Sequence, residues 1–179
     1  DFRSMISATD PGTGERERAL VQLKGVDAAY PLYGAPGLDP AIPLDRALVR
    51  GELPGLVAQP VLIDRLGLEI GDTVRLGTQD FTLRAALTSE PDAAAAGLGL
   101  GPRVIVTQAG LQDSGLLAPG TLFEVKYRLR VPEGTDLAAM RADLERAFPD
   151  AGIRWRDRSN GAPGVARFVD RLGAFLVLV

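Results

Sequence analysis

The chain has 179 residues, of which 46% are hydrophobic and 24% charged, a composition typical of one globular domain or of two small ones. Twenty Lys and Arg against 23 Asp and Glu give a net charge of -3, too weak to predict a polyanionic partner. The sequence contains neither Cys nor His, which excludes thiol nucleophiles, disulfides, imidazole-dependent catalysis and the usual zinc sites. Most enzyme classes are therefore disfavoured, and we expect no catalytic, cofactor-binding or metal-binding residues.

The first half of the chain predicts short elements separated by Pro-rich and Gly-rich connections. Residues 30–55 are too rich in Pro and Gly for long regular elements, so we expect an irregular connection there. The expected elements are, in chain order, a strand at 19–26, a short helix at 44–49, a helix at 61–66 with Pro60 in its first turn, and a hairpin of strands at 73–76 and 81–87.

Residues 55–92 are predicted to form a small β-rich lobe of their own. Six apolar residues can supply its core: Leu62, Leu66, Val74, Leu76, Phe81 and Leu83. A unit of this size buries too little apolar area to be stable alone, so we expect it to lean on the rest of the protein. The Pro-rich and Gly-rich connection before it and the Ala-rich and Gly-rich run at 93–102 would then act as a hinge.

The second half predicts a strand, a helix and a strand. After a short buried strand at 103–106, residues 122–131 alternate apolar and charged side chains. Thr135 or Asp136 is expected to cap a helix that ends at Phe148 and carries the apolar stripe Leu137, Met140, Leu144 and Phe148. A last strand is expected at 153–158. This order is typical of a βαβ or split βαβ unit in an α+β fold.

The two strands of that unit each carry basic residues on one face. These are Lys126, Arg128, Arg130, Arg154, Arg156 and Arg158. Tyr127 and Trp155 alternate out of phase with them, so the face lacks the aromatic side chains that stack on bases, and nucleic acid is a disfavoured partner. A solvated face, or a face near anionic lipid headgroups or an acidic partner, remains open.

Two short motifs match known functional signatures, but their context favours chance. Gly97, Gly99 and Gly101 suggest a phosphate loop, but a dinucleotide fingerprint must follow a strand and open a helix, whereas Pro102 and a strand follow here. Asp113-Ser114-Gly115 matches the tripeptide of aspartic proteases, whose chemistry needs two carboxylates that share a proton. A single copy within the end of a helix favours coincidence.

Residues 165–179 become increasingly apolar. Val165, Phe168, Val169 and Leu172 follow helical spacing, and the run that ends at Val179 is apolar on every side. We expect residues 166–179 to be the truncated start of a membrane-spanning helix, with a C-terminal core strand as the alternative.

Several segments together resemble one family of bacterial membrane proteins. Val21-Gln22-Leu23-Lys24-Gly25-Val26-Asp27 followed by Tyr30-Pro31-Leu32-Tyr33-Gly34 resembles the opening of the extracytoplasmic domain in ABC-transporter permeases of the FtsX, LolC/LolE and MacB group, closest to its YbbP-like branch. The stretches 66–74 and 87–92 resemble the small β-rich module of that group, and residues 167–179 resemble the entry to a second membrane helix.

The resemblance implies an extracytoplasmic, periplasmic domain of a bacterial inner-membrane permease with a MacB-like core. Residues 1–54 and 93–165 would form a ferredoxin-like porter part, residues 55–92 the inserted lobe, and residues 166–179 the start of the second membrane helix. Such a permease pairs with a cytoplasmic ATPase and passes ATP-driven motion to a lipid, a lipoprotein or a periplasmic protein. The resemblance implies no active site, and it leaves undecided whether the protein forms a homodimer. The alternatives are a non-enzymatic binding module and, less favoured, a carboxylate-dependent hydrolase.

Overall fold

The computed structural model describes residues 1–9, 14–91 and 101–157, which fall into two units, Asp1–Arg128 and Leu129–Val179. The elements of unit 1 are, in chain order, β1 (Phe2–Thr9), β2 (Arg16–Val26), β3 (Gly37–Asp39), α1 (Leu44–Leu48), β4 (Gly55–Ala58), α2 (Pro60–Arg65), β5 (Thr73–Leu76), β6 (Gln79–Ser89), β7 (Arg103–Thr107) and α3 (Gln108–Asp113). The described part of unit 2 contains α4 (Leu137–Ala147). Unit 1 carries the sheet, so the architecture is a sheet-rich α+β fold.

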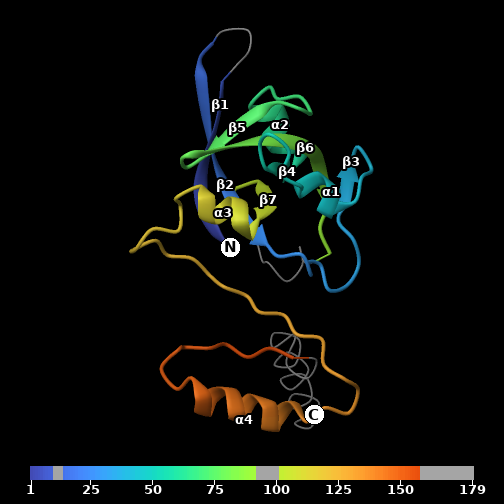
Figure 1. Cartoon of the computed structure of the whole chain (residues 1–179), viewed down its shortest axis with the longest axis vertical. Helices are drawn as coiled ribbons and strands as arrows, with labels where there is room; N and C mark the ends of the chain where they lie inside the picture. The colour runs from blue at the N-terminus through green and yellow to red at the C-terminus, as the bar shows by residue number, and fades with distance from the viewer. Residues whose placement is uncertain (10–13, 92–100, 158–179) are drawn as a thin grey trace, which may run out of the picture. The chain divides into compact units, whose positions relative to one another are not determined.

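Unit 1 is a ring of strands (Figure 1). The strands are ordered β3-β6-β4-β7-β2-β1-β5, and β5 also pairs with β6, so six strands close on themselves while β3 is added outside along β6. The pairs β2–β7 and β4–β6 are parallel and the others antiparallel. β3 has Pro36 and Pro40 on its two sides, and proline limits further pairing along an outer strand because it cannot donate a backbone hydrogen bond.

A β-bulge lets β6 supply side chains to two cores. Leu56 of β4 pairs with Leu83 and the next residue, Val57, pairs with Ala85, so Arg84 is an extra residue in β6. Regular alternation would place residues 81, 83, 85 and 87 on one face. Instead Leu83 packs in the main core with residues of β1, β2, β5 and β7, whereas Ala85 packs in a second core with residues of α1 and β3.

The predicted elements up to residue 107 are confirmed within a few residues at their ends. The six residues proposed for the core of the lobe are all buried, but they share the main core with residues of β1 and β2, such as Ile6 and Val21. The strands expected for a separate lobe thus belong to the same sheet as the rest of unit 1. The functional division of the chain at residues 55 and 92 stays a prediction.

The strands predicted at 122–131 and 153–158 are wrong as far as the structure describes these residues: 122–131 and 153–157 contain no strand. A strand is stable only beside a neighbour that satisfies its backbone. Leu122 is 93% exposed and Tyr127 88% exposed. Alternation identified segments suited to a strand, but it carries no information on the presence of a neighbour. A complete split βαβ unit is therefore not formed by the described residues.

The helix between these segments was predicted correctly. Asp136 is the N-cap of α4, and its Oδ1 accepts hydrogen bonds from the backbone N–H groups of Ala138 and Ala139, both at 3.0 Å. α4 has no buried residue, and Phe148 of its predicted stripe is 56% exposed. In the described part of the chain no helix has the length and apolar character needed to cross a membrane. The membrane helix predicted at 166–179 lies outside the described residues.

Candidate functional site

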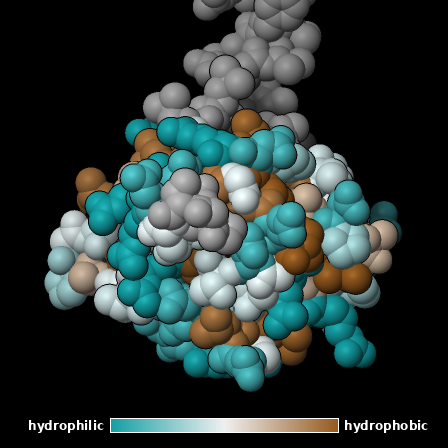
Figure 2. Space-filling model, turned by 90° about the horizontal axis from the view of Figure 1, so that it is seen from above, coloured by the Kyte–Doolittle hydropathy of each residue, from teal (hydrophilic) through white to brown (hydrophobic). Residues whose placement is uncertain are grey.

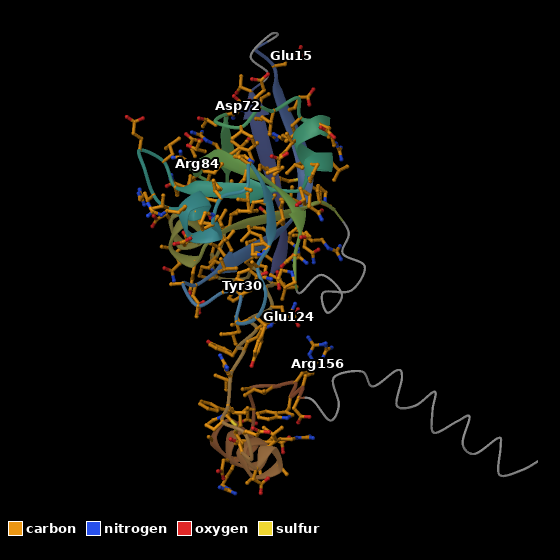
Figure 3. The ribbon with its side chains drawn as sticks, turned by 90° about the vertical axis from the view of Figure 1, so that its right-hand side faces the viewer. Glu15, Tyr30, Asp72, Arg84, Glu124 and Arg156 are labelled. Atoms are coloured by element: carbon orange, nitrogen blue, oxygen red, sulfur yellow. The ribbon has the colours of Figure 1, made fainter. Side chains whose placement is uncertain are left out.

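The candidate site is a group of charged side chains at the end of the ring where the chain enters β1. The opposite end, where Thr9 of β1 pairs with Arg16 of β2, presents mostly hydrophilic residues with small separate apolar patches (Figure 2). Tyr30 and Glu124 lie at the end of the ring opposite Glu15 (Figure 3). We call this group the anchor cluster, and it consists of Asp1, Lys24, Tyr30, Glu90, Arg103, Glu124 and Lys126.

Glu90 is the centre of the buried half of the anchor cluster. Its side chain is 6% exposed and follows directly after β6. Its Oε1 accepts hydrogen bonds from Lys24 Nζ and, at 2.8 Å, from the hydroxyl of Tyr30. Its Oε2 lies 3.3 Å from Nε of Arg103, the first residue of β7. One carboxylate therefore connects β2, the loop after it, β6 and β7.

Asp1 joins this half to the segment that follows α3. Its Oδ1 accepts a hydrogen bond from Arg103 Nη1 at 2.9 Å, and its Oδ2 accepts one from Lys126 Nζ at 3.0 Å. Lys126 Nζ also lies 3.1 Å from Glu124 Oε2. The backbones of Asp1 and Glu124 exchange two hydrogen bonds, of 2.8 and 2.9 Å. The segment around Glu124 is thus attached to the ring by backbone and side-chain contacts together.

The local structure explains why these charges meet. Glu90 and Arg103 stand at the two ends of the 92–100 connection, so their ion pair closes that connection at its base. The side chain of Gln59 holds Arg103 in place, because its Oε1 accepts a hydrogen bond from the Arg103 backbone N–H at 2.9 Å. Lys24 lies two residues along β2 from Gln22, which pairs with Arg103 across the parallel β2–β7 ladder. The anchor cluster therefore follows from sheet register rather than from one local motif.

Burial and charge shift the pKa values within the anchor cluster. Burial lowers the pKa of Lys24, and the hydrogen bond and charge of Glu90 oppose this only in part. Burial and the neighbouring Glu90 raise the pKa of Tyr30. Burial alone would raise the pKa of Glu90, but hydrogen bonds from Lys24 and Tyr30 and the charges of Lys24 and Arg103 hold it below its ordinary value of 4.5. The Glu90 carboxyl group thus faces two basic groups, the amine of Lys24 and the guanidinium of Arg103.

The lowered pKa of Glu90 predicts a loss of stability in acid. Because the folded state lowers this pKa, the ionised group stabilises the fold above the ordinary value of 4.5, and that stabilisation is lost as the pH falls through the folded-state pKa. We expect the free energy of unfolding, measured with urea, to decrease between about pH 5 and pH 3. Glu90→Gln should be less stable at pH 7 and should flatten this decrease, whereas Glu52→Gln, at an exposed position, should leave it unchanged. An equal acid dependence in wild type and Glu90→Gln would contradict the assignment.

The glycine-rich run and the Asp113-Ser114-Gly115 tripeptide contribute no residue to the anchor cluster. Asp113 is the last residue of α3 and forms an exposed ion pair with Arg50 at 2.9 Å, while the Ser114 hydroxyl donates to the Leu111 carbonyl at 2.6 Å. The tripeptide is thus a helix end, as its context predicted. Gly97 and Gly99 lie outside the described residues. The structure describes no strand to form a shared basic face: Lys126 belongs to the anchor cluster, and Arg158 lies outside the described residues.

Sequence reasoning missed the pairing of Glu90 with Arg103. The two residues flank a connection rich in Gly and Ala, and each follows or opens a predicted strand. The sequence did contain one signal for this ion pair: a negative charge just after one predicted strand and a positive charge at the start of the next. The parallel pairing of β2 with β7 brings Lys24 close to Arg103, and local sequence patterns could not predict that pairing.

An open groove adjoins the anchor cluster through Tyr30. It has a volume of about 450 Å³ and lies between α1 and the start of α3, at the carboxyl ends of the parallel strands β2 and β7. Its walls are mainly apolar, with Leu44, Leu48 and Val49 on one side. Tyr30 lines the groove while its hydroxyl is bound to Glu90. Anything that displaced Tyr30 would therefore also disturb the anchor cluster.

The comparisons with known proteins identify one relative of known class. Over 164 residues the chain is 24% identical to an uncharacterized ABC transporter permease, YbbP, of Escherichia coli (strain K12). The match covers 89% of this chain and 19% of that permease, so the chain spans about a fifth of the length of its relative. No family model matches the sequence. An ABC transporter permease is thus a distant homologue of this chain.

Proposed function

We propose that this chain is the extracytoplasmic part of an ABC transporter permease and that it has no catalytic activity of its own. In the full-length protein it would pass the ATP-driven motion of the membrane helices to a lipid, a lipoprotein or a partner protein outside the membrane. The observation that supports this most is the similarity to a permease over 89% of the chain. The membrane helices and the cytoplasmic ATPase would belong to the remainder of the transporter.

The anchor cluster supports a mechanical role. Force applied to the segment around Lys126 would reach Asp1, then Arg103 at the start of β7, and then Glu90 at the end of β6. Three of these four side chains are less than 13% exposed, so water does not weaken their interactions as it does at the surface. We further propose that residues 1–54 and 93–165 form the porter part in the full-length protein.

The location is tested by labelling single cysteines, since the chain has none. Val61 in unit 1 is 60% exposed and suits Val61→Cys, and Ala138 in α4 is also exposed. In cells whose outer barrier is opened but whose inner membrane is intact, a membrane-impermeant maleimide should label both variants of the full-length protein. Labelling that requires lysis of the inner membrane would contradict the extracytoplasmic location.

Transmission of motion is tested with the same two positions. A spin label is attached at each in the full-length permease with its ATPase, and the distance between the labels is measured with and without a non-hydrolysable ATP analogue. The proposal expects the distance distribution to change on nucleotide binding. Identical distributions would show that ATP binding does not alter the arrangement of the two units, and the transmission proposal would fail.

A further inference from the structure

The segment Glu124–Arg128 has the side-chain pattern of a strand, yet it belongs to no strand among the described residues. Val125 is 57% exposed and Tyr127 88% exposed, and both residue types favour strands. Charged residues occupy the alternate positions. Exposure of apolar side chains in such a segment points to a partner that covers them.

One rung of that pairing is already present. The terminal nitrogen of Asp1, which is a backbone N–H group in a longer polypeptide, donates to the Glu124 carbonyl at 2.8 Å, and the Glu124 N–H donates to the Asp1 carbonyl at 2.9 Å. Two residues that exchange both hydrogen bonds form the hydrogen-bonded pair of an antiparallel ladder. The pairing of Asp1 with Glu124 therefore fixes both the direction and the register of whatever continues from it.

The ion pairs agree with this register. In an antiparallel ladder the side chain of Asp1 faces the same side of the sheet as Glu124, directly opposite it, and Lys126 as its diagonal neighbour. Lys126 Nζ contacts Asp1 Oδ2 at 3.0 Å and Glu124 Oε2 at 3.1 Å. Side chains and backbone thus independently indicate the same antiparallel arrangement.

We propose that the residues preceding Asp1 in the full-length polypeptide form a strand that pairs antiparallel with Val125–Tyr127. Continuing the ladder from the Asp1–Glu124 rung places the first residue before Asp1 opposite Val125. The second residue before Asp1 then lies opposite Lys126, and the third lies opposite Tyr127. The matched region makes up 19% of the permease relative, so most of a polypeptide of that length lies outside this chain. The strand would cover the exposed apolar side chains of Val125 and Tyr127.

The partner strand has a defined chemistry. The residues opposite Val125 and Tyr127 should be apolar, and the residue between them, opposite Lys126, should be polar. The incoming and outgoing parts of the chain would then run side by side as a two-stranded stem at the base of unit 1. This inference concerns the architecture of the stem and stands whether or not the domain transmits ATP-driven motion.

The test is amide hydrogen exchange on the full-length protein in detergent without nucleotide, resolved to single residues by electron-transfer fragmentation. Successive residues of a strand direct their N–H groups to opposite edges, so the N–H of Lys126 faces the proposed strand and those of Val125 and Tyr127 face away. The Lys126 amide should exchange about 100-fold more slowly than its two neighbours. Equal protection of all three amides, or rapid exchange of all three, would overturn the proposal. Charged residues at both positions assigned to Val125 and Tyr127 in the full-length sequence would overturn it as well.

Discussion

Arg103→Ala should destabilise unit 1 by about 3–5 kcal/mol, because it leaves two nearly buried carboxylates without their shared cation. The Arg103 side chain is 8% exposed and contacts Glu90 and Asp1, whose side chains are 6% and 12% exposed. Lys24 and Lys126 would each still serve one of these carboxylates, but neither reaches both. The free energy of unfolding from urea titration at pH 7 measures the effect.

The matched control is Arg75→Ala. Arg75 forms a two-point ion pair with Asp80, at 2.6 and 2.7 Å, which is shorter than the contacts of Arg103 at 2.9 and 3.3 Å but lies at the surface. Water screens a surface pair, which therefore contributes little to stability, so Arg75→Ala should cost far less than Arg103→Ala. Equal losses for the two variants would show that burial adds nothing to the anchor cluster. In the full-length permease, Arg103→Ala should also abolish the nucleotide-dependent change in label distance while Arg75→Ala preserves it.

Local sequence patterns predicted β2, β5, β6, β7, α1 and α2 because each of these obeys a rule of short range, whereas the strands β1, β3 and β4 were not predicted. Alternation found β2, Pro60 marked the start of α2, and Asp136 capped α4. The β5–β6 hairpin was also predicted, but with a four-residue turn at 77–80. The structure has the two-residue turn Gly77-Thr78, in which Gly77 adopts a φ of 58° that favours glycine. The same glycine also meets a tertiary requirement: a Cβ there would lie 2.2 Å from the Ser114 carbonyl oxygen.

Long-range pairing was not visible in those patterns. The bulge at Arg84 moves Ala85 into a different core from Leu83, although the sequence alternates without a break through both residues. Closure of the ring by β5 joins residues 55–92 to the sheet of β1 and β2. The predicted hinge required residues 55–92 to form a lobe with its own sheet. Whether they do depends on the pairing of distant strands, which local patterns do not reveal.

The same limit applies to the candidate site. Lys24 lies 66 residues before Glu90 in the chain, and parallel pairing of β2 with β7 brings Lys24 near Arg103. The basic strand faces drew attention to Lys126, but as a surface for lipid or an acidic partner. Its structural role depends on Asp1, at the other end of unit 1 in sequence, which no local pattern connects to it.

Phe81→Ala should be as damaging as the loss of Arg103, for a different reason. Phe81 is fully buried and is the largest side chain of the core. Truncation of a buried Phe to Ala costs about 3–5 kcal/mol, through lost transfer free energy and the cavity left behind. Phe81→Leu keeps most of the apolar volume and should cost clearly less. Urea unfolding of both variants gives the comparison, and similar losses would mean that the core does not depend on the size of this side chain.

The contact between Phe81 and α3 can be isolated by a double-mutant cycle. A Cβ on Gly110 would lie 2.9 Å from Phe81 Cε1, so Gly110→Ala should destabilise wild type by forcing the ring aside. Leu in place of Phe81 lacks the ring atoms that create this clash. Gly110→Ala should therefore cost at least about 1 kcal/mol less in the Phe81→Leu background, a coupling well outside the few tenths expected of independent sites. Additive losses would show that α3 does not rest on Phe81, and that the start of the segment leading to Glu124 is positioned by other contacts.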